Sequence, residues 1–231
     1  MSLIIAAANQ KGGVGKSTCT LLAATALSLP PFNYRVEALD IDPQRSLYGR
    51  RQYDLEDVEE GKEAPQPPYP VHALKFADFA TQVKTFDRRA EILFLDVPGK
   101  LDSSAGKDSE AIQALQYVDV VLVPVTAGNF ALAATVDYIK AVLAVQRKRP
   151  ELRLIAFHNM HRTRSRHGRL LSDELDELAR LTGAQLMQTP LKRYSAFEDA
   201  DTLHTLYGER GNAGENFTAW LDELHQALTN K

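Results

Sequence analysis

Short apolar runs recur along the chain and alternate with segments that have the spacing of amphipathic helices. The runs at 92–95 and 152–157 contain at most one polar side chain, which is typical of strands buried on both faces of a parallel sheet. Strands are expected at 3–8, 35–42, 71–74, 92–96, 118–125, 152–157 and 184–188, and helices at 19–29, 76–86, 131–147 and 215–228. This alternation predicts an α/β fold, a doubly wound and mostly parallel sheet with helices on both faces.

The composition is that of an ordinary globular protein. The chain has 231 residues, 44% hydrophobic and 25% charged, so a single domain over 1–231 is expected. No apolar run approaches the roughly 18 residues that span a bilayer, and no leader segment precedes the first strand, which indicates a cytoplasmic protein. The net charge of −3 gives no global signal for nucleic-acid binding. The only cysteine, Cys19, excludes internal disulfides and is expected to pack in the core.

A glycine-rich segment, K-G-G-V-G-K-S-T at residues 11–18, joins the first expected strand to the first helix. In such a connection the backbone N–H groups and the positive end of the helix dipole bind phosphates. Lys16 can reach the β- and γ-phosphates, and the Ser17 hydroxyl can ligate magnesium. The expected nucleotide-binding residues of the loop are Lys11, Gly12, Gly13, Val14, Gly15, Lys16, Ser17 and Thr18.

Carboxylates follow two of the expected strands. Asp40 and Asp42 end the strand at 35–42, and Asp96 ends the strand at 92–96. Open α/β sheets bind ligands beyond the carboxyl ends of their strands. An acid after a buried strand beside a phosphate loop is the arrangement that holds magnesium, so Asp96 and Ser17 are expected in one metal site.

Two motifs resemble the ParA/MinD family of ATPases, whose phosphate loop is a deviant Walker A box. The standard box requires glycine at position 10, where this chain has Gln10, and the loop starts instead with a second lysine, Lys11. Residues 40–44 match the family's D-x-D-P-Q motif completely. After Asp96 the chain departs from the family's D-x-P-P pattern, because Gly99 replaces the second proline.

The resemblance implies an ATPase that uses ATP and Mg²⁺ and forms an ATP-dependent sandwich homodimer. In that family the extra lysine crosses the dimer interface to the partner's nucleotide, and Lys11 matches it. Asp42 would orient the attacking water, and Asp40 would support the loop and the hydrated magnesium. Lys11 and Lys16 would stabilise phosphate charge.

The strand at 152–157 is followed by a candidate base-binding residue. By the same resemblance, Asn159 would hydrogen-bond adenine, whereas an asparagine that forms a turn fits the position equally well. Pro190 is grouped with the nucleotide-binding residues.

Basic residues are concentrated in the second half of the chain. Between positions 147 and 169, eight lysines and arginines stand against one acid, a local balance of +7. Arginines spread over a loop and a helix start suit contacts to DNA phosphates without base reading. The alternative is a solvated surface or a role at the dimer interface. The candidate DNA-binding residues are Arg147, Lys148, Arg162, Arg164, Arg166, Arg169, Lys192 and Arg193.

Together these features predict a ParA-like ATPase that binds DNA nonspecifically at the nucleoid and segregates a cargo: a plasmid, a chromosome or a protein compartment. Its slow hydrolysis would be stimulated by a ParB-type or small adaptor protein. A MinD-like membrane or division-site regulator is disfavoured because the helix at 215–228 carries Glu215, Asp222 and Glu223 where a membrane helix needs basic residues. A metabolic ligase resembling dethiobiotin synthetase would share the loop but gain nothing from Lys11.

Overall fold

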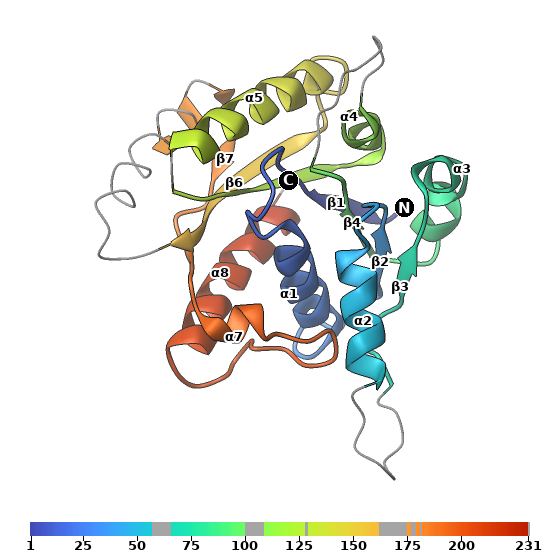
Figure 1. Ribbon diagram of the computed structural model, residues 1–231, viewed down its shortest axis with the longest axis vertical. Helices are drawn as coiled ribbons and strands as arrows, with labels where there is room; N and C mark the ends of the chain where they lie inside the picture. Colours follow the sequence, from blue (N-terminus) through green and yellow to red (C-terminus); the bar gives the residue numbers. More distant parts are fainter. Residues whose placement is uncertain are drawn as a thin grey trace.

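A parallel sheet forms the centre of the computed structural model (Figure 1). The structure describes residues 1–56, 66–99, 109–127, 129–161, 175, 176, 179, 180 and 182–230, with residues 129–133 described by their backbone only. The strands are β1 (Leu3–Ala7), β2 (Val36–Asp40), β3 (Val71–Ala73), β4 (Ile92–Asp96), β5 (Val120–Val125), β6 (Arg153–His161), β7 (Gln185–Leu186) and β8 (Leu191–Lys192). The helices are α1 (Lys16–Ser28), α2 (Ser46–Glu56), α3 (Phe76–Asp87), α4 (Glu110–Ala114), the 3₁₀ helix η1 (Leu115–Tyr117), α5 (Asn129–Gln146), α7 (Ser195–Glu198) and α8 (Asn212–Thr229).

The strand order is β3-β2-β4-β1-β5-β6-β7, with β8 also paired to β6. Every pairing is parallel. The first strand of the chain therefore lies inside the sheet, where Ile5 is in register with Phe94 on one side and Val120 on the other. The expected α/β fold with a parallel sheet is confirmed. Its consequence is that the loops after β1, β2 and β4 leave the sheet at the same edge.

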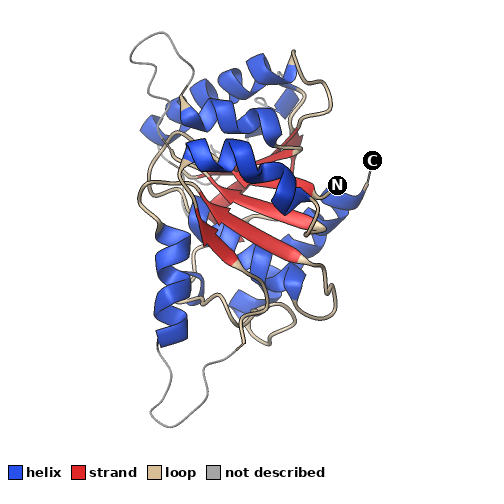
Figure 2. Cartoon of the chain, turned by 90° about the vertical axis from the view of Figure 1, so that its right-hand side faces the viewer, coloured by secondary structure: helices blue, strands red, loops and turns tan. Residues whose placement is uncertain are grey.

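Helices cover both faces of the sheet (Figure 2). Successive strand residues point to opposite faces, so Ile5 and Phe94 pack with α1 and α8, while Ile4 and Leu93 pack with α3 and α5. This double burial is the physical reason that the strands lack polar and apolar alternation.

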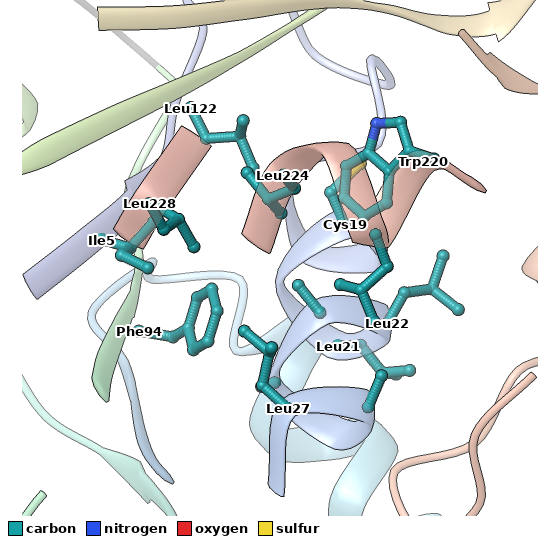
Figure 3. Packing of buried hydrophobic residues seen from close by; sticks show 14 of the residues in the cluster. Ile5, Cys19, Leu21, Leu22, Leu27, Phe94, Leu122, Trp220, Leu224 and Leu228 are labelled. Atoms are coloured by element: carbon teal, nitrogen blue, oxygen red, sulfur yellow. The ribbon is translucent and has the colours of Figure 1, made fainter. Parts of the chain in front are cut away.

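The C-terminal helix packs its apolar stripe against α1 and the sheet (Figure 3). Phe217, Trp220, Leu221 and Leu224 are each 0% exposed, and Leu228 is 7% exposed. The stripe expected from the sequence is therefore part of the core and does not offer an apolar face to a lipid surface. Among the helices of the described residues, none is long and apolar enough to cross a bilayer.

Cys19 lies in the same core, on α1 (Figure 3). It is 0% exposed, and burial raises the pKa of its thiol well above the usual range. A thiol that stays protonated is a poor nucleophile, so Cys19 is a packing residue, as expected.

Helix α2 was not predicted from the sequence, because two of the side chains that it buries are charged. The Arg51 side chain donates to the Thr202 hydroxyl at 2.6 Å and to the Thr202 carbonyl at 3.1 Å, and its guanidinium lies over the Tyr69 ring. The neighbouring Asp54 carboxylate accepts from the Thr202 N–H at 2.8 Å. These bonds fasten α2 to the segment after α7. Charged residues that serve a buried network have the sequence appearance of a solvated face.

Gly214 marks a close approach between α8 and the turn before it. A Cβ at this position would lie 2.3 Å from the Glu209 carbonyl oxygen. We expect Gly214→Ala to destabilise the fold by about 1–3 kcal/mol, because backbone must move to admit the methyl group. The exposed Gly49 of α2 has no atom within 4 Å of its Cβ position, so Gly49→Ala should instead stabilise by up to about 1 kcal/mol. Urea unfolding of both variants checks the opposite signs; equal shifts would contradict the contact at Gly214.

Candidate functional site

The loop between β1 and α1 has a backbone that requires glycine. Gly13 and Gly15 have φ angles of 73° and 86°, and Gly15 is the N-cap of α1. Its carbonyl accepts the first helical bond, from the Cys19 N–H at 2.8 Å. The loop and the first turn of α1 line a cavity of about 890 Å³ that also reaches Asp42, Pro98 and Gly99. This volume lies within the range of small-molecule sites.

Asn9, which the sequence interpretation did not single out, fixes the start of this loop. It is 1% exposed, and its side-chain nitrogen donates to the Pro124 carbonyl and the Thr135 hydroxyl, both at 2.9 Å. Its side-chain oxygen accepts from the Lys11 N–H at 3.1 Å. The loop is thereby tied to the ends of β1 and β5 and to α5.

The second lysine of the loop is held by its backbone only. Lys11 is exposed, and no ion pair engages its ammonium among the described residues. Within the described part of the chain, the bond from its backbone N–H to the Asn9 side chain is therefore the contact that holds Lys11.

The two acids after β2 differ in what they bind. Both Asp40 oxygens accept backbone hydrogen bonds, from the Asp42 N–H at 3.1 Å and the Tyr48 N–H at 2.9 Å. Burial raises the pKa of Asp40, and these two donors oppose the rise. Asp42 accepts from the Gln44 N–H at 2.9 Å and lines the cavity. Asp40 therefore shapes the loop, and Asp42 is the one of these two acids that lines the cavity.

Asp96 is a buried carboxylate at the end of β4, close to the Ser17 hydroxyl. It is in register with Ala7 of β1 and Asp40 of β2 and is 0% exposed. Burial raises its pKa from 3.8 to about 7; the nearby Ser17 hydroxyl opposes this rise, and the Asp40 and Asp42 charges add to it. A buried carboxylate beside a serine hydroxyl fits a hard divalent cation, which takes oxygen ligands.

Gly99 allows the segment after β4 to close over Lys16. A Cβ on Gly99 would lie 2.9 Å from the Lys16 ammonium nitrogen and 3.4 Å from the Asn9 carbonyl oxygen. Gly99, which stands where the family has its second proline, therefore lies directly beside Lys16. Residues 100–108, which follow Gly99, lie outside the described residues.

The opposite side of the loop faces the ends of β6 and β8. Gly15, Thr18, Asn159, Leu191 and Tyr194 are among the residues around a small cavity of about 40 Å³. The Asn159 side chain is directed toward the loop, where its nitrogen donates to the Val14 carbonyl at 2.7 Å.

Helix α8 holds the segment 188–192, of which Leu191 and Lys192 line this cavity. The Glu223 carboxylate accepts from the N–H groups of Gln188 and Thr189 at 2.6 and 2.7 Å. Asn216 donates to the Pro190 carbonyl at 2.9 Å and accepts from the Lys192 N–H at 2.8 Å. Glu223, assigned to the polar face of the helix from the sequence, thus has a structural role that only the tertiary contacts reveal.

Comparison with known proteins places this geometry in a family. Residues 5–206 match the family described as the CobQ/CobB/MinD/ParA nucleotide binding domain. The chain belongs to this family. A search of curated protein sequences finds no match.

Solved structures share the fold at low identity. Cyanothece McdA(D38A) in complex with ATP aligns with a TM-score of 0.71 and 13% identity, over 97% of this chain and 96% of that one. A plasmid partition protein from Borrelia burgdorferi bound to AMPPNP gives 0.68 and 18%, over 98% and 99%. Cobyrinic acid a,c-diamide synthase from Mycobacterium smegmatis, with an ATP analogue and magnesium, gives 0.69 and 18%, over 100% and 96%. The resemblance to the ParA/MinD family is confirmed, while likeness at this identity shows the fold alone.

The candidate DNA-binding residues of this CobQ/CobB/MinD/ParA chain fall in separate places. Lys192 and Arg193 lie at the edge of the sheet that carries the glycine-rich loop, around the same small cavity as Gly15. Arg147 and Lys148 follow α5 and precede β6, so they lie toward the amino-terminal ends of the strands. The nine-residue strand β6, about 30 Å long, separates them from Lys192 and Arg193. Arg162, Arg164, Arg166 and Arg169 lie outside the described residues.

Two further arginines of the basic segment have structural roles. Arg149 donates to the carbonyls of Leu115, Gln116 and Val118, around η1. Arg153 donates to three carbonyls at the end of α8, including Ala227 at 2.9 Å. Part of the local positive charge therefore serves the fold.

Proposed function

We propose that this chain is a Mg²⁺-dependent ATPase of the ParA type, which dimerises with ATP, binds DNA nonspecifically at the nucleoid and positions a cargo. The observation that carries the proposal is the buried carboxylate of Asp96 at the end of β4, close to Lys16 and the Ser17 hydroxyl of the glycine-rich loop. In support, the structural neighbours include a plasmid partition protein with AMPPNP and McdA with ATP.

The residues divide the chemistry among them. Loop N–H groups and Lys16 would bind the phosphates, and Ser17 and Asp96 would hold Mg²⁺, which when bound neutralises phosphate charge. Asp42 would orient water for attack, because its carboxylate lines the cavity while Asp40 fixes its backbone. The exposed Lys11 would reach the nucleotide of a second subunit.

DNA contacts are proposed for the phosphate-loop edge. Lys192 and Arg193 lie there on a segment that α8 holds in place. An ATP-closed dimer would bring two such edges together and double the positive surface, which would make DNA binding depend on nucleotide. A ParB-type or small adaptor would stimulate hydrolysis by completing the water and phosphate geometry.

The decisive experiment is DNA retardation with Asp42→Ala, a variant expected to retain ATP without hydrolysing it. We expect DNA binding with ATP but not ADP, without sequence preference, and at least 100-fold weaker at about 200 mM salt than at about 50 mM. Lys11→Ala should bind ATP as a monomer and fail to retard DNA, which sedimentation with ATP will show.

A pair of charge-matched variants separates the two basic regions. Lys192→Ala/Arg193→Ala and Arg147→Ala/Lys148→Ala each remove two positive charges, and only the first pair is expected to weaken retardation. ATP-dependent dimers that bind no DNA at low salt would reject the DNA-positioning function. Turnover of ATP only with a small amine or acid substrate would instead indicate ligase chemistry, as the cobyrinic acid synthase neighbour would suggest.

A further inference from the structure

We propose that Asn159 is a positioning residue for the phosphate loop, acting on phosphate binding through the backbone of the loop. Asn159 is 5% exposed at the end of β6, and its side-chain nitrogen donates to the Val14 carbonyl at 2.7 Å. The contact joins residues that are 145 positions apart in the chain. It attaches the middle of the loop to the sheet.

The amide orientation follows from the chemistry of its partner. A backbone carbonyl can only accept, so the NH₂ group of Asn159 must face Val14. A Cβ on Gly15 would lie 2.4 Å from the same nitrogen, so the amide packs directly against the N-cap of α1. The donor side of Asn159 is therefore occupied by the loop and is not directed at a base.

Asn9 and Asn159 hold the loop from its two sides. Asn9 accepts from the Lys11 N–H, and Asn159 donates to the Val14 carbonyl. Between these two bonds lie the glycines whose N–H groups would face phosphate. Without Asn159, the Val14 carbonyl would lose its partner and the loop would sample more conformations, so binding would have to order it.

The backbone conformation of Met160, the residue after Asn159, is consistent with a fixed contact between Asn159 and the loop. Met160 has a φ of 53°, and the pairing of β6 with β8 is irregular between Asn159 and His161. Its Cε would lie 3.5 Å from a Cβ on Gly15. The end of β6 thus leaves regular strand geometry where its side chains meet the loop.

Because Asn159 would act on bound phosphate, this role rests on the proposed nucleotide function, and the experiment separates the two. Binding of Mg-ATP, Mg-GTP and Mg-tripolyphosphate is measured by calorimetry for the wild type, Asn159→Ala and Asn159→Asp. Amide hydrogen exchange of residues 12–16 is measured in the nucleotide-free proteins. Asn212→Ala, the same change at the exposed first residue of α8, is the control.

A positioning role predicts that Asn159→Ala weakens all three ligands by a similar factor, roughly 5- to 100-fold, because tripolyphosphate has no base. Asn159→Asp should do the same, since it keeps an acceptor oxygen for a base but loses the donor to Val14. Exchange at 12–16 should accelerate in Asn159→Ala and not in Asn212→Ala.

Loss of ATP affinity alone, with tripolyphosphate unchanged, would overturn the proposal and make Asn159 a base-recognition residue. Unchanged exchange at 12–16 would also overturn it. If Asn159→Asp does not fold, Asn159→Ala decides. If the wild type binds none of the three ligands, the ATPase function fails, and the exchange data still decide whether Asn159 orders the loop.

Discussion

Asp96→Asn is expected to stabilise the metal-free protein at pH 8 while abolishing Mg²⁺-dependent hydrolysis. Burial raises the pKa of Asp96 from 3.8 to about 7, so ionising this carboxylate opposes folding. A rise of this size corresponds to a destabilisation of up to about 4 kcal/mol above pH 7. The neutral amide avoids that cost but cannot supply a charged ligand to Mg²⁺.

The stabilisation by Asp96→Asn is expected to increase with pH. Below pH 3.8 the carboxyl of Asp96 is neutral in both the folded and the unfolded chain, and it carries no penalty. Between pH 3.8 and about 7 the unfolded chain ionises first, so the wild type loses stability as the pH rises. The difference between Asp96→Asn and the wild type should therefore be largest at pH 8 and smallest near pH 4.

Urea unfolding of metal-free protein from pH 4 to pH 8 measures this difference. Asp137→Asn is a suitable control, because the Asp137 side chain is 67% exposed and pairs with Lys140 across the surface. That variant should stay within about 0.5 kcal/mol of the wild type throughout. Curves for Asp96→Asn and wild type that run parallel across the whole range would show that Asp96 carries no buried charge penalty.

Gly15→Ala is expected to abolish nucleotide binding, with an affinity loss of more than about 100-fold, and to destabilise the fold by about 2–3 kcal/mol. Two physical terms contribute. The φ of 86° disfavours a side chain by about 1–2 kcal/mol. The new methyl group would also lie 2.4 Å from the Asn159 amide nitrogen, which must move and release Val14.

A double-mutant cycle separates these terms. In the Asn159→Ala background the obstructing amide is gone, so Gly15→Ala should cost less stability there than in the wild type, leaving mainly the backbone strain. Gly49→Ala serves as the control for a glycine with open space around its Cβ position. Additive effects of Gly15→Ala and Asn159→Ala on unfolding free energy would contradict the contact between these two residues.

The apolar runs and their helical intervals made the sheet predictable. Strand β4 was predicted over the residues that it occupies, because a continuous run of four apolar residues before Asp96 is typical of a strand buried on both faces. Helix α2 was missed, since two of the side chains that it buries, Arg51 and Asp54, are charged and bind Tyr69 and Thr202, which lie far from them in sequence. The short helices α4 and α7 give no periodic signal over five and four residues.

The basic residues give a second example of a feature that the sequence shows but does not place in space. Positive charge is visible in sequence, but the sequence interpretation placed Arg147 and Lys192 in one group of candidate DNA-binding residues. Strand β6 lies between them and carries the chain from one edge of the sheet to the other. Charge counted along a chain therefore does not locate a surface.

The sequence by itself determined the family and the parallel α/β fold, and it predicted the glycine-rich loop and the carboxylates Asp42 and Asp96 as site residues, because glycine spacing and acids after buried runs are local patterns. The tertiary structure alone decided that Asn9 and Asn159 hold the loop, that Gly99 covers Lys16 and that α8 fixes the segment around Pro190. They depend on residues far apart in sequence, since Asn9 bonds to Pro124 and Asn159 bonds to Val14. Their energies depend on burial and hydrogen-bond geometry, which exist only after the sheet has assembled.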